Sequence, residues 1–382
     1  AAMERQFSFR CHPGDIEDEG VDAALGRRAG DLGIDTVTIT ATHPGIYQVR
    51  PRPLGGRRTF ESAAAAHFLP DSARYGSSRI RPHAAAWLKN RNPLERIARV
   101  AERERLSLRA RISCLKGEEL VSRYTHAACV NVFGDPSREW LCASNPDVRE
   151  YVASLIDDLC TNCGLDAGER EDRDARDERT RVACGTLSNN GALGLTSGCF
   201  CASCRQRAND AGLDLDAVRT ALIDQWQTAC NGRAGQQPDP SSGESSDALI
   251  GPCVEVRAAA IASFLQSIKK RLPAALRYVH PSMPSGVSDA ASKEAGIAIM
   301  PVSTVATGGL AGWQIDRATG VEVMISTQSG AMRDGPALVA LVHQLAESGC
   351  GGIGFDHYGV TSESGLDGVR QAVRYARRDS GG

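Results

Sequence analysis

The sequence lacks a long apolar run and an excess of charge of either sign. No window approaches the roughly eighteen consecutive apolar residues of a transmembrane helix, and the first fifteen residues have neither the apolar core nor the cleavage site of an export signal. The 44 Lys+Arg and 46 Asp+Glu residues give a net charge of −2, whereas a general nucleic-acid binder normally carries a basic face. We therefore expect a cytoplasmic protein with neither a membrane nor a nucleic acid as its partner.

Two catalytic motifs are also missing, and aromatic residues are few. The first β–α turn has no Gly-x-Gly-x-x-Gly, which argues against a dinucleotide-binding sheet, and no Gly-x-Ser-x-Gly forms a serine nucleophile elbow. Aromatic residues make up only 5% of the chain, which argues against a long glycan as the ligand. The 13 cysteines in 382 residues are too sparse for a disulfide scaffold, so we expect reduced thiols, some of them holding a metal.

Strand-like and helix-like patterns alternate along the chain. The strand candidates are residues 6–10, 36–40, 106–115, 166–171, 275–280, 297–302, 321–326 and 352–355, with amphipathic helices between most of them. Alternation of this kind predicts a parallel sheet, and about eight units predict a closed (β/α)8 TIM barrel, with an open doubly wound sheet as the alternative. We expect one domain over residues 1–382, with insertions at about 44–92 and 172–198, after the second and fourth strands, and a flexible loop at about 233–247.

Three cysteines fall within six residues, at Cys199, Cys201 and Cys204. Zinc takes four soft ligands, so this Cys-x-Cys-x-x-Cys segment would supply three and leave the fourth to another part of the chain. The candidates for the fourth ligand are Cys142, Cys160, Cys163 and Cys184. Unligated thiols are the alternative, an iron–sulfur cluster fits the spacing less well, and a thiol redox or metal-sensing protein would need reactive cysteines.

Residues 140–150 (WLCASNPDVRE), followed by the Cys-x-Cys-x-x-Cys segment, carry a resemblance. The chain resembles the barrel domain of family 42 glycoside hydrolases, which are beta-galactosidases, and it is similar to uncharacterised bacterial hypothetical glycoside hydrolases over about residues 10–215. The shared phrases with the latter are 131–136 (NVFGDP), 141–142 (LC), 145–149 (NPDVR) and 199–201 (CFC). The resemblance implies a structural zinc held by Cys142, Cys199, Cys201 and Cys204.

Glycoside hydrolysis needs two carboxyl groups, and in a barrel they lie at the carboxyl ends of strands. The resemblance places the acid/base after the fourth strand, where Glu169 and Glu171 are the candidates, although the dense run of charges there is also typical of a solvated loop. The family's nucleophile follows the seventh strand, where this chain has Gln328. Asp356, after the eighth strand, is therefore the expected second carboxylate.

Three further residues are expected to contact the substrate. His43 follows the second strand, and His357 and Tyr358 follow Asp356; each also fits an ordinary polar loop. The sequence predicts a glycoside hydrolase-like protein that acts on a small-molecule or oligosaccharide substrate through paired carboxylates at the carboxyl-terminal face. The alternative is a catalytically silent barrel that binds a carbohydrate or a protein partner.

Overall fold

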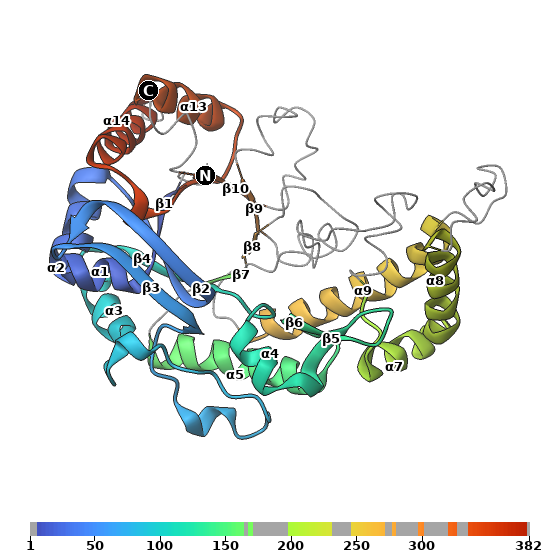
Figure 1. Cartoon of the computed structure of the whole chain (residues 1–382). Helices are drawn as coiled ribbons and strands as arrows, with labels where there is room; N and C mark the ends of the chain where they lie inside the picture. The colour runs from blue at the N-terminus through green and yellow to red at the C-terminus, as the bar shows by residue number, and fades with distance from the viewer. Residues whose placement is uncertain are drawn as a thin grey trace.

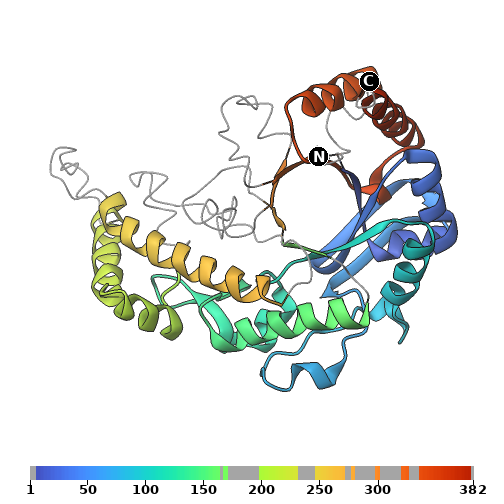
Figure 2. The same ribbon diagram turned by 180° about the vertical axis from the view of Figure 1, so that it is seen from behind.

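The computed structural model describes residues 6–163, 167–170, 198–230, 246–271, 277–279, 297–301, 320–326 and 335–379. Within these ranges the protein has a mixed α/β fold whose main sheet is strongly curled, with helices outside it (Figures 1 and 2). No described helix is long and apolar enough to cross a membrane.

Parallel strands form the curled part of the main sheet. The order is β1-β11-β10-β9-β8-β7-β4-β2, and β1 also pairs with β2, so the parallel pairings return to the strand where they start. The strands are β1 (Gln6–Cys11), β2 (Thr36–Leu54), β4 (Ser107–Ile112), β7 (Ala167–Arg170), β8 (Arg277–Val279), β9 (Ile297–Pro301), β10 (Gly320–Ser326) and β11 (Gly352–Asp356). Because these strands run parallel, their carboxyl ends lie on one face.

The main core joins buried residues of neighbouring strands to residues of the helices outside the sheet. Phe9 on β1 is in register with Val37 on β2 and with Phe355 on β11, and all three are fully buried. They belong to the main core, which also includes residues of the surrounding helices. These helices are α1 (Pro13–Glu19), α2 (Val21–Arg27), α3 (Pro93–Arg103), α4 (Glu118–Arg123), α5 (Pro146–Asn162), α13 (Gly335–Glu347) and α14 (Glu363–Asp379).

A second, smaller core lies in an arm beside the curled sheet. It is formed largely by α7 (Ala202–Asp210) and α8 (Leu215–Cys230), and α9 (Ser246–Lys269) connects the arm to the main body (Figure 1). The buried residue Phe200 packs there, and its backbone N–H donates to Val130 O at 2.8 Å. This bond ties the arm to the short antiparallel pair β5 (Ala128–Val130) and β6 (Pro136–Leu141).

The second strand is much longer than the sequence indicates. β2 continues past Thr40 to Leu54 and turns back as β3 (Arg57–Ala66), so part of the expected insertion at 44–92 is a β-hairpin. One face of this hairpin buries Gln48, Arg50 and Arg52. Charged residues at alternate positions conceal this strand in the sequence, because a strand is normally recognised by alternating apolar residues.

The structure confirms the predicted α/β class with a curled parallel sheet. Eight complete β/α units stay a prediction, because the connections at 280–296 and 302–319 lie outside the described residues. The same holds for residues 172–197 and 233–245, which cover nearly all of the second predicted insertion and the predicted flexible loop. The last two residues of that loop, Ser246 and Asp247, instead begin α9.

Candidate functional site at the carboxyl ends of the strands

Asp356 ends β11 next to the arginine that β1 contributes to the same face. Arg10 Nη1 lies 3.4 Å from Asp356 Oδ2, and 29% of the Asp356 side chain is exposed. Burial raises the pKa of Asp356, but the charges of Arg10, Arg111 and His357 outweigh it and leave the pKa below its ordinary value. Asp356 is therefore an anion at neutral pH, which suits a nucleophile or a base and does not suit a proton donor.

His12 follows β1 and caps the short helix α1. Its Nδ1 accepts from Gly14 N–H at 3.1 Å, and its own backbone N–H donates to the Asp15 carboxylate at 3.3 Å, which forms a capping box. The side chain is fully buried. Burial, with smaller contributions from His67, His357 and other nearby groups, lowers the pKa of His12 well below its ordinary value, so the ring is neutral.

Two further histidines approach His12. His67, which follows β3, is fully buried with its ring centroid 4.2 Å from that of His12, and its Nδ1 accepts from Trp87 Nε1–H at 3.2 Å. Burial lowers the pKa of His67 to about 3. His43, on β2, accepts from Gly45 N–H at 3.2 Å, and burial followed by the charge of Arg111 lowers its pKa to about 4.

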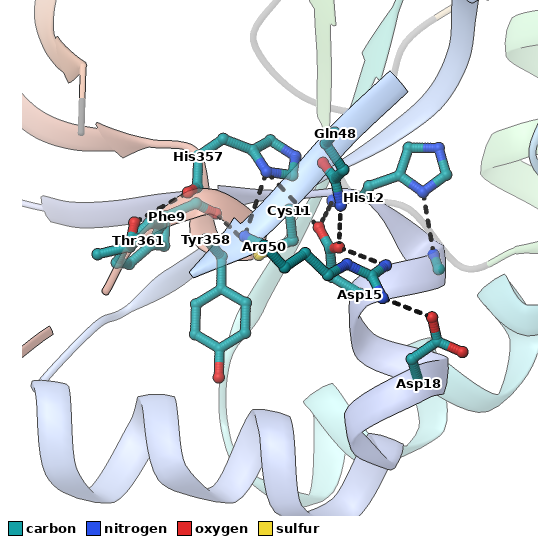
Figure 3. A network of polar contacts seen from close by, with 12 residues as sticks. Phe9, Cys11, His12, Asp15, Asp18, Gln48, Arg50, His357, Tyr358 and Thr361 are labelled. Atoms are coloured by element: carbon teal, nitrogen blue, oxygen red, sulfur yellow. Dashed lines mark hydrogen bonds and ion pairs between the residues drawn. The ribbon is translucent and has the colours of Figure 1, made fainter. Parts of the chain in front are cut away.

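A buried ion-pair network connects the segments that carry these histidines (Figure 3). Arg50, on the long strand β2, contacts Asp15 at 2.8 Å and Asp18 at 2.7 Å. Gln48 also donates to Asp15, whose carboxylate lies 3.5 Å from His357 Nδ1. The β2 extension therefore holds α1 and the loop after β11 against each other, which positions the histidines of both segments.

The loop after β11 places its two expected substrate contacts differently. His357 is partly exposed, and its Nδ1 accepts from Gly359 N–H at 3.3 Å. Tyr358 is fully buried, donates its hydroxyl to Glu19, and packs its ring 4.5 Å from the Arg52 guanidinium. Tyr358 thus supports the loop, and its contact with a substrate stays a prediction.

The remaining predicted carboxylates are less fully described. Glu169 lies on β7, and its backbone is in register with Arg111 on β4. Glu171 lies outside the described residues. The structure therefore brings Asp356, His43 and His357 together at one face, while the side chains of the two glutamates stay untested.

The four predicted metal ligands meet at a second location, between β6 and the start of α7. Cys142 Sγ lies 3.4 Å from Cys204 Sγ, 3.5 Å from Cys201 Sγ and 3.7 Å from Cys199 Sγ, and all four sulfurs lie within 4.8 Å of one another. A tetrahedron with sulfur at about 2.3 Å from zinc has edges of about 3.8 Å. These four sulfurs form a group that could hold a metal ion, and Cys142 is the fourth member from the open list of candidates.

A fifth cysteine, absent from the sequence-based ligand set, adjoins this group. Cys129, on β5, adjoins Cys142 and Cys199, and its interaction with these two thiols is the largest cause that lowers the pKa of both. Its Sγ also lies 3.4 Å from Leu141 O. Cys129 therefore supports thiolates at two of the four positions while standing beside the group.

Sequence reasoning missed His12 and His67 as members of the first site. A signal for His12 was present, because His12-Pro-Gly14 repeats the pattern His43-Pro-Gly45, and both follow a strand. His67 has no such signal, since its partner Trp87 lies twenty residues away and meets it only in the folded chain.

The comparisons with known proteins show similarity in fold. No protein-family model and no curated protein sequence matches the chain. Similar solved structures include alpha-L-fucosidase isoenzyme 2 from Paenibacillus thiaminolyticus, with a TM-score of 0.59, 12% identity, and coverage of 99% of this chain and 50% of that one. A beta-galactosidase from Marinomonas ef1 has a TM-score of 0.55 and 10% identity, covering 98% and 60%.

A beta-galactosidase from Halorubrum lacusprofundi is also similar, with a TM-score of 0.57, 11% identity, and coverage of 97% of this chain and 58% of that one. The chain thus spans about half to three fifths of the length of these three structures. Identities this low establish the fold alone. The protein has a glycoside hydrolase-like fold.

Proposed function

We propose that the protein is a glycoside hydrolase whose active site lies at the carboxyl ends of β1, β2, β7 and β11. One observation carries the proposal: Asp356 is a partly exposed carboxylate, kept ionised by Arg10 and Arg111, at the face where enzymes with barrel folds hold their catalytic residues. In this proposal Asp356 is the anionic partner, and Glu169 or Glu171 supplies the proton to the leaving oxygen.

Arg111 supports the pairing of these groups. It is the register partner of Glu169 on the neighbouring strand, and its charge lowers the pKa of Asp356. A carboxyl group that donates a proton at neutral pH needs a raised pKa; the negative charge of Asp356 would raise the pKa of Glu169 and Arg111 would lower it, so the pairing requires the effect of Asp356 to be the larger. The neutral histidines near Asp356 would then bind the hydroxyl groups of the sugar.

We also infer that the curled sheet belongs to one complete (β/α)8 barrel spanning residues 1–382, with insertions after β2 and β7. The return of the parallel pairings to β1 supports this inference. The connections at 280–296 and 302–319 would supply the remaining helices.

We further propose that Cys142, Cys199, Cys201 and Cys204 hold one structural zinc. Four thiolate donors at tetrahedral spacing suit zinc and leave no position open for a substrate. The metal would join the loop after β6 to the arm that begins at α7, and would stabilise the fold without taking part in the reaction.

The test of the hydrolase proposal is a panel of nitrophenyl glycosides assayed with wild type and four variants. Asp356→Asn, Glu169→Gln and Glu171→Gln each remove one titrating group, while Asp224→Asn, on the exposed side of α8, is the matched control. We expect turnover in wild type, its loss in Asp356→Asn and in one of the two glutamate variants, and no change in the control. No turnover of any glycoside by wild type would favour the catalytically silent barrel.

A further inference from the structure

Three neighbouring strands carry the same short pattern at or just after their ends or, in β2, within the strand: a histidine followed two residues later by glycine. The pattern is His12-Pro-Gly14 after β1, His43-Pro-Gly45 in β2 and His357-Tyr-Gly359 after β11. Since β1 pairs with both β2 and β11, the three histidines emerge side by side. His67 joins them from β3, with its ring 4.2 Å from that of His12.

Each of these rings uses Nδ1 as a hydrogen-bond acceptor. The backbone N–H of the glycine donates to Nδ1 at 3.1 Å in His12, at 3.2 Å in His43 and at 3.3 Å in His357. In His67 the donor is the indole N–H of Trp87, a group that can only donate. A neutral imidazole that accepts at Nδ1 carries its proton on Nε2, so His12, His43 and His67 present N–H groups.

Two of these N–H groups are buried and are not satisfied by any described residue. Among the residues that the structure describes, none accepts a hydrogen bond from Nε2 of His12 or from Nε2 of His67, and both side chains are fully buried. A buried donor left unsatisfied costs about 1 to 3 kcal/mol. An acceptor atom brought to these donors by a ligand would recover that free energy.

The hydrogen-bond pattern also decides which kind of ligand fits. A metal ion needs the lone pair of the ligating nitrogen, and the other ring nitrogen of such a histidine donates its proton to an acceptor. Here His12, His43 and His67 have the opposite arrangement. The charge of Arg111 acts on His43 and that of Arg50 on His12, while Arg50 is paired with Asp15 and Asp18 and Asp356 also acts on His43. N–H donors that no described residue satisfies, with the charge of Arg111 nearby, favour a negatively charged oxygen.

We propose that His12, His43 and His67 form a binding site for an oxyanion that the ligand carries, as in the carboxylate of a uronic acid or the sulfate of a sulfated sugar. The sugar part of this inference rests on the proposed function, whereas the oxyanion part stands on the hydrogen bonds alone. The site thereby selects acidic sugars over neutral ones.

Asparagine is the substitution that tests the role of Nε2. An asparagine side-chain oxygen takes the position of Nδ1 and can accept the same local N–H, whereas nothing replaces Nε2. His12→Asn and His43→Asn therefore keep an acceptor for the glycine N–H and lose the outer donor, and His67→Asn keeps an acceptor for Trp87 Nε1–H and likewise loses the outer donor. His343→Asn, on the partly exposed surface of α13, is the matched control.

The experiment is calorimetric titration of the full chain with galacturonate and galactose, glucuronate and glucose, galactose 6-sulfate and inorganic sulfate. We expect the acidic sugars to bind at least about tenfold more tightly than their neutral partners, which is about 1.4 kcal/mol, and each of the three asparagine variants to lose about that factor. His343→Asn should bind as wild type does. Preference for galacturonate or for galactose 6-sulfate identifies the source of the oxyanion, and competition by inorganic sulfate supports the shared chemistry.

Equal affinity for acidic and neutral sugars would overturn the proposal, as would unchanged affinity in all three variants. If a buried variant fails to fold, His43→Asn decides, because His43 is only partly buried. Nitrogen-15 NMR gives an independent readout, and a proton on Nδ1 of these rings would contradict the proposal. Hydrolysis of neutral glycosides without anion binding overturns this inference alone, and anion binding without hydrolysis overturns only the proposed function.

Discussion

The cysteine group and the histidine group of this protein bring similar numbers of side chains together in opposite ways. The sulfurs of Cys142, Cys199, Cys201 and Cys204 all face one another within 4.8 Å, so their lone pairs meet at one point. The rings of His12 and His67 are as close, with centroids 4.2 Å apart, but each Nδ1 is occupied by an N–H donor. One group collects lone pairs and suits a cation, and the other presents protons and suits an anion.

The hydrogen-bond partners of a group of side chains therefore determine whether the group suits a cation or an anion. Cysteines and histidines are both common metal ligands, and the identity of the residues alone would favour a metal at both places. The glycine N–H groups next to His12 and His43 convert those rings into donors. Cys129, beside the cysteine group, has the reverse effect, because its interaction with Cys142 and Cys199 favours their thiolate form.

We expect the largest effect from a substitution that disrupts the cysteine group. Cys142→Ala removes one proposed zinc ligand, and we expect it to lower the free energy of unfolding by more than about 4 kcal/mol, because the binding energy of a structural zinc is folding energy. Elemental analysis and thermal unfolding, each with and without a chelator, measure this. Cys160→Ser, a half-buried cysteine outside the group, is the matched control and should keep one zinc per chain. A wild type that contains no metal and whose four thiols all react in the native state would refute the zinc proposal.

A smaller effect is expected at the carboxylate beside the histidine group. Asp356→Asn keeps the shape of the side chain and removes its charge, so kcat on any substrate found should fall by about 10³-fold. The zinc content should stay unchanged, because the two sites are separate. Circular dichroism and a metal assay on the same sample distinguish a catalytic loss from a folding loss. A variant with the kcat of wild type would exclude Asp356 from the reaction.

Gly359, two residues after His357, allows a test of how closely the His-x-Gly segment after β11 packs against Asp15. A Cβ at Gly359 would overlap the Asp15 carboxylate, which is fully buried and paired with Arg50. We expect Gly359→Ala to reduce the free energy of unfolding by about 2 kcal/mol, a cost typical of overpacking. Gly26→Ala, in helix α2 with open space around it, should instead raise stability by about 0.5 to 1 kcal/mol. Urea unfolding measures both, and equal effects would contradict the packing argument.

The smallest expected effect is the contribution of the histidine group to the pH dependence of the free energy of unfolding. The pKa of His67 is about 3 and that of His43 about 4 in the folded chain, against 6.5 for an unperturbed histidine. Between these values the unfolded chain binds protons that the folded chain does not, so stability falls as the pH drops below about 6.5, by up to about 1.4 kcal/mol per unit for each ring. Besides burial, Arg111, His357 and Asp356 act on His43, and His43 acts on His67.

Urea unfolding at pH 5, 6 and 7 checks this dependence. We expect His67→Asn to remove about 1 to 2 kcal/mol of the stability change between pH 7 and pH 5, while His343→Asn leaves the change as it is in wild type. An identical pH dependence in wild type and His67→Asn would show that this ring is not held neutral by the fold.

Much of the fold could be predicted from local patterns. The run Thr36–Thr40 predicts a buried strand, and the structure has β2 there; the Asn-Pro start at residue 145 predicts α5, and the Asn145 side chain accepts from Asp147 N–H at 2.9 Å. The extension of β2 to Leu54 could not be predicted. Its buried row contains Arg50, and a buried arginine is tolerated only because Asp15 and Asp18 approach it from a helix more than thirty residues earlier.

Local sequence patterns indicate two features of this protein: the alternation of strands and helices, and the three closely spaced cysteines. Both follow from neighbouring residues, whose spacing fixes their geometry. The spacing left the fourth cysteine open, the resemblance implied Cys142, and the fold brings its sulfur to the other three. The position of Arg10 beside Asp356 and the approach of the histidines of three strands follow from folding alone. The reason is physical. Pairing of β1 with β11 joins segments more than three hundred residues apart, and the partner that each side chain meets there sets its charge and the proton it carries.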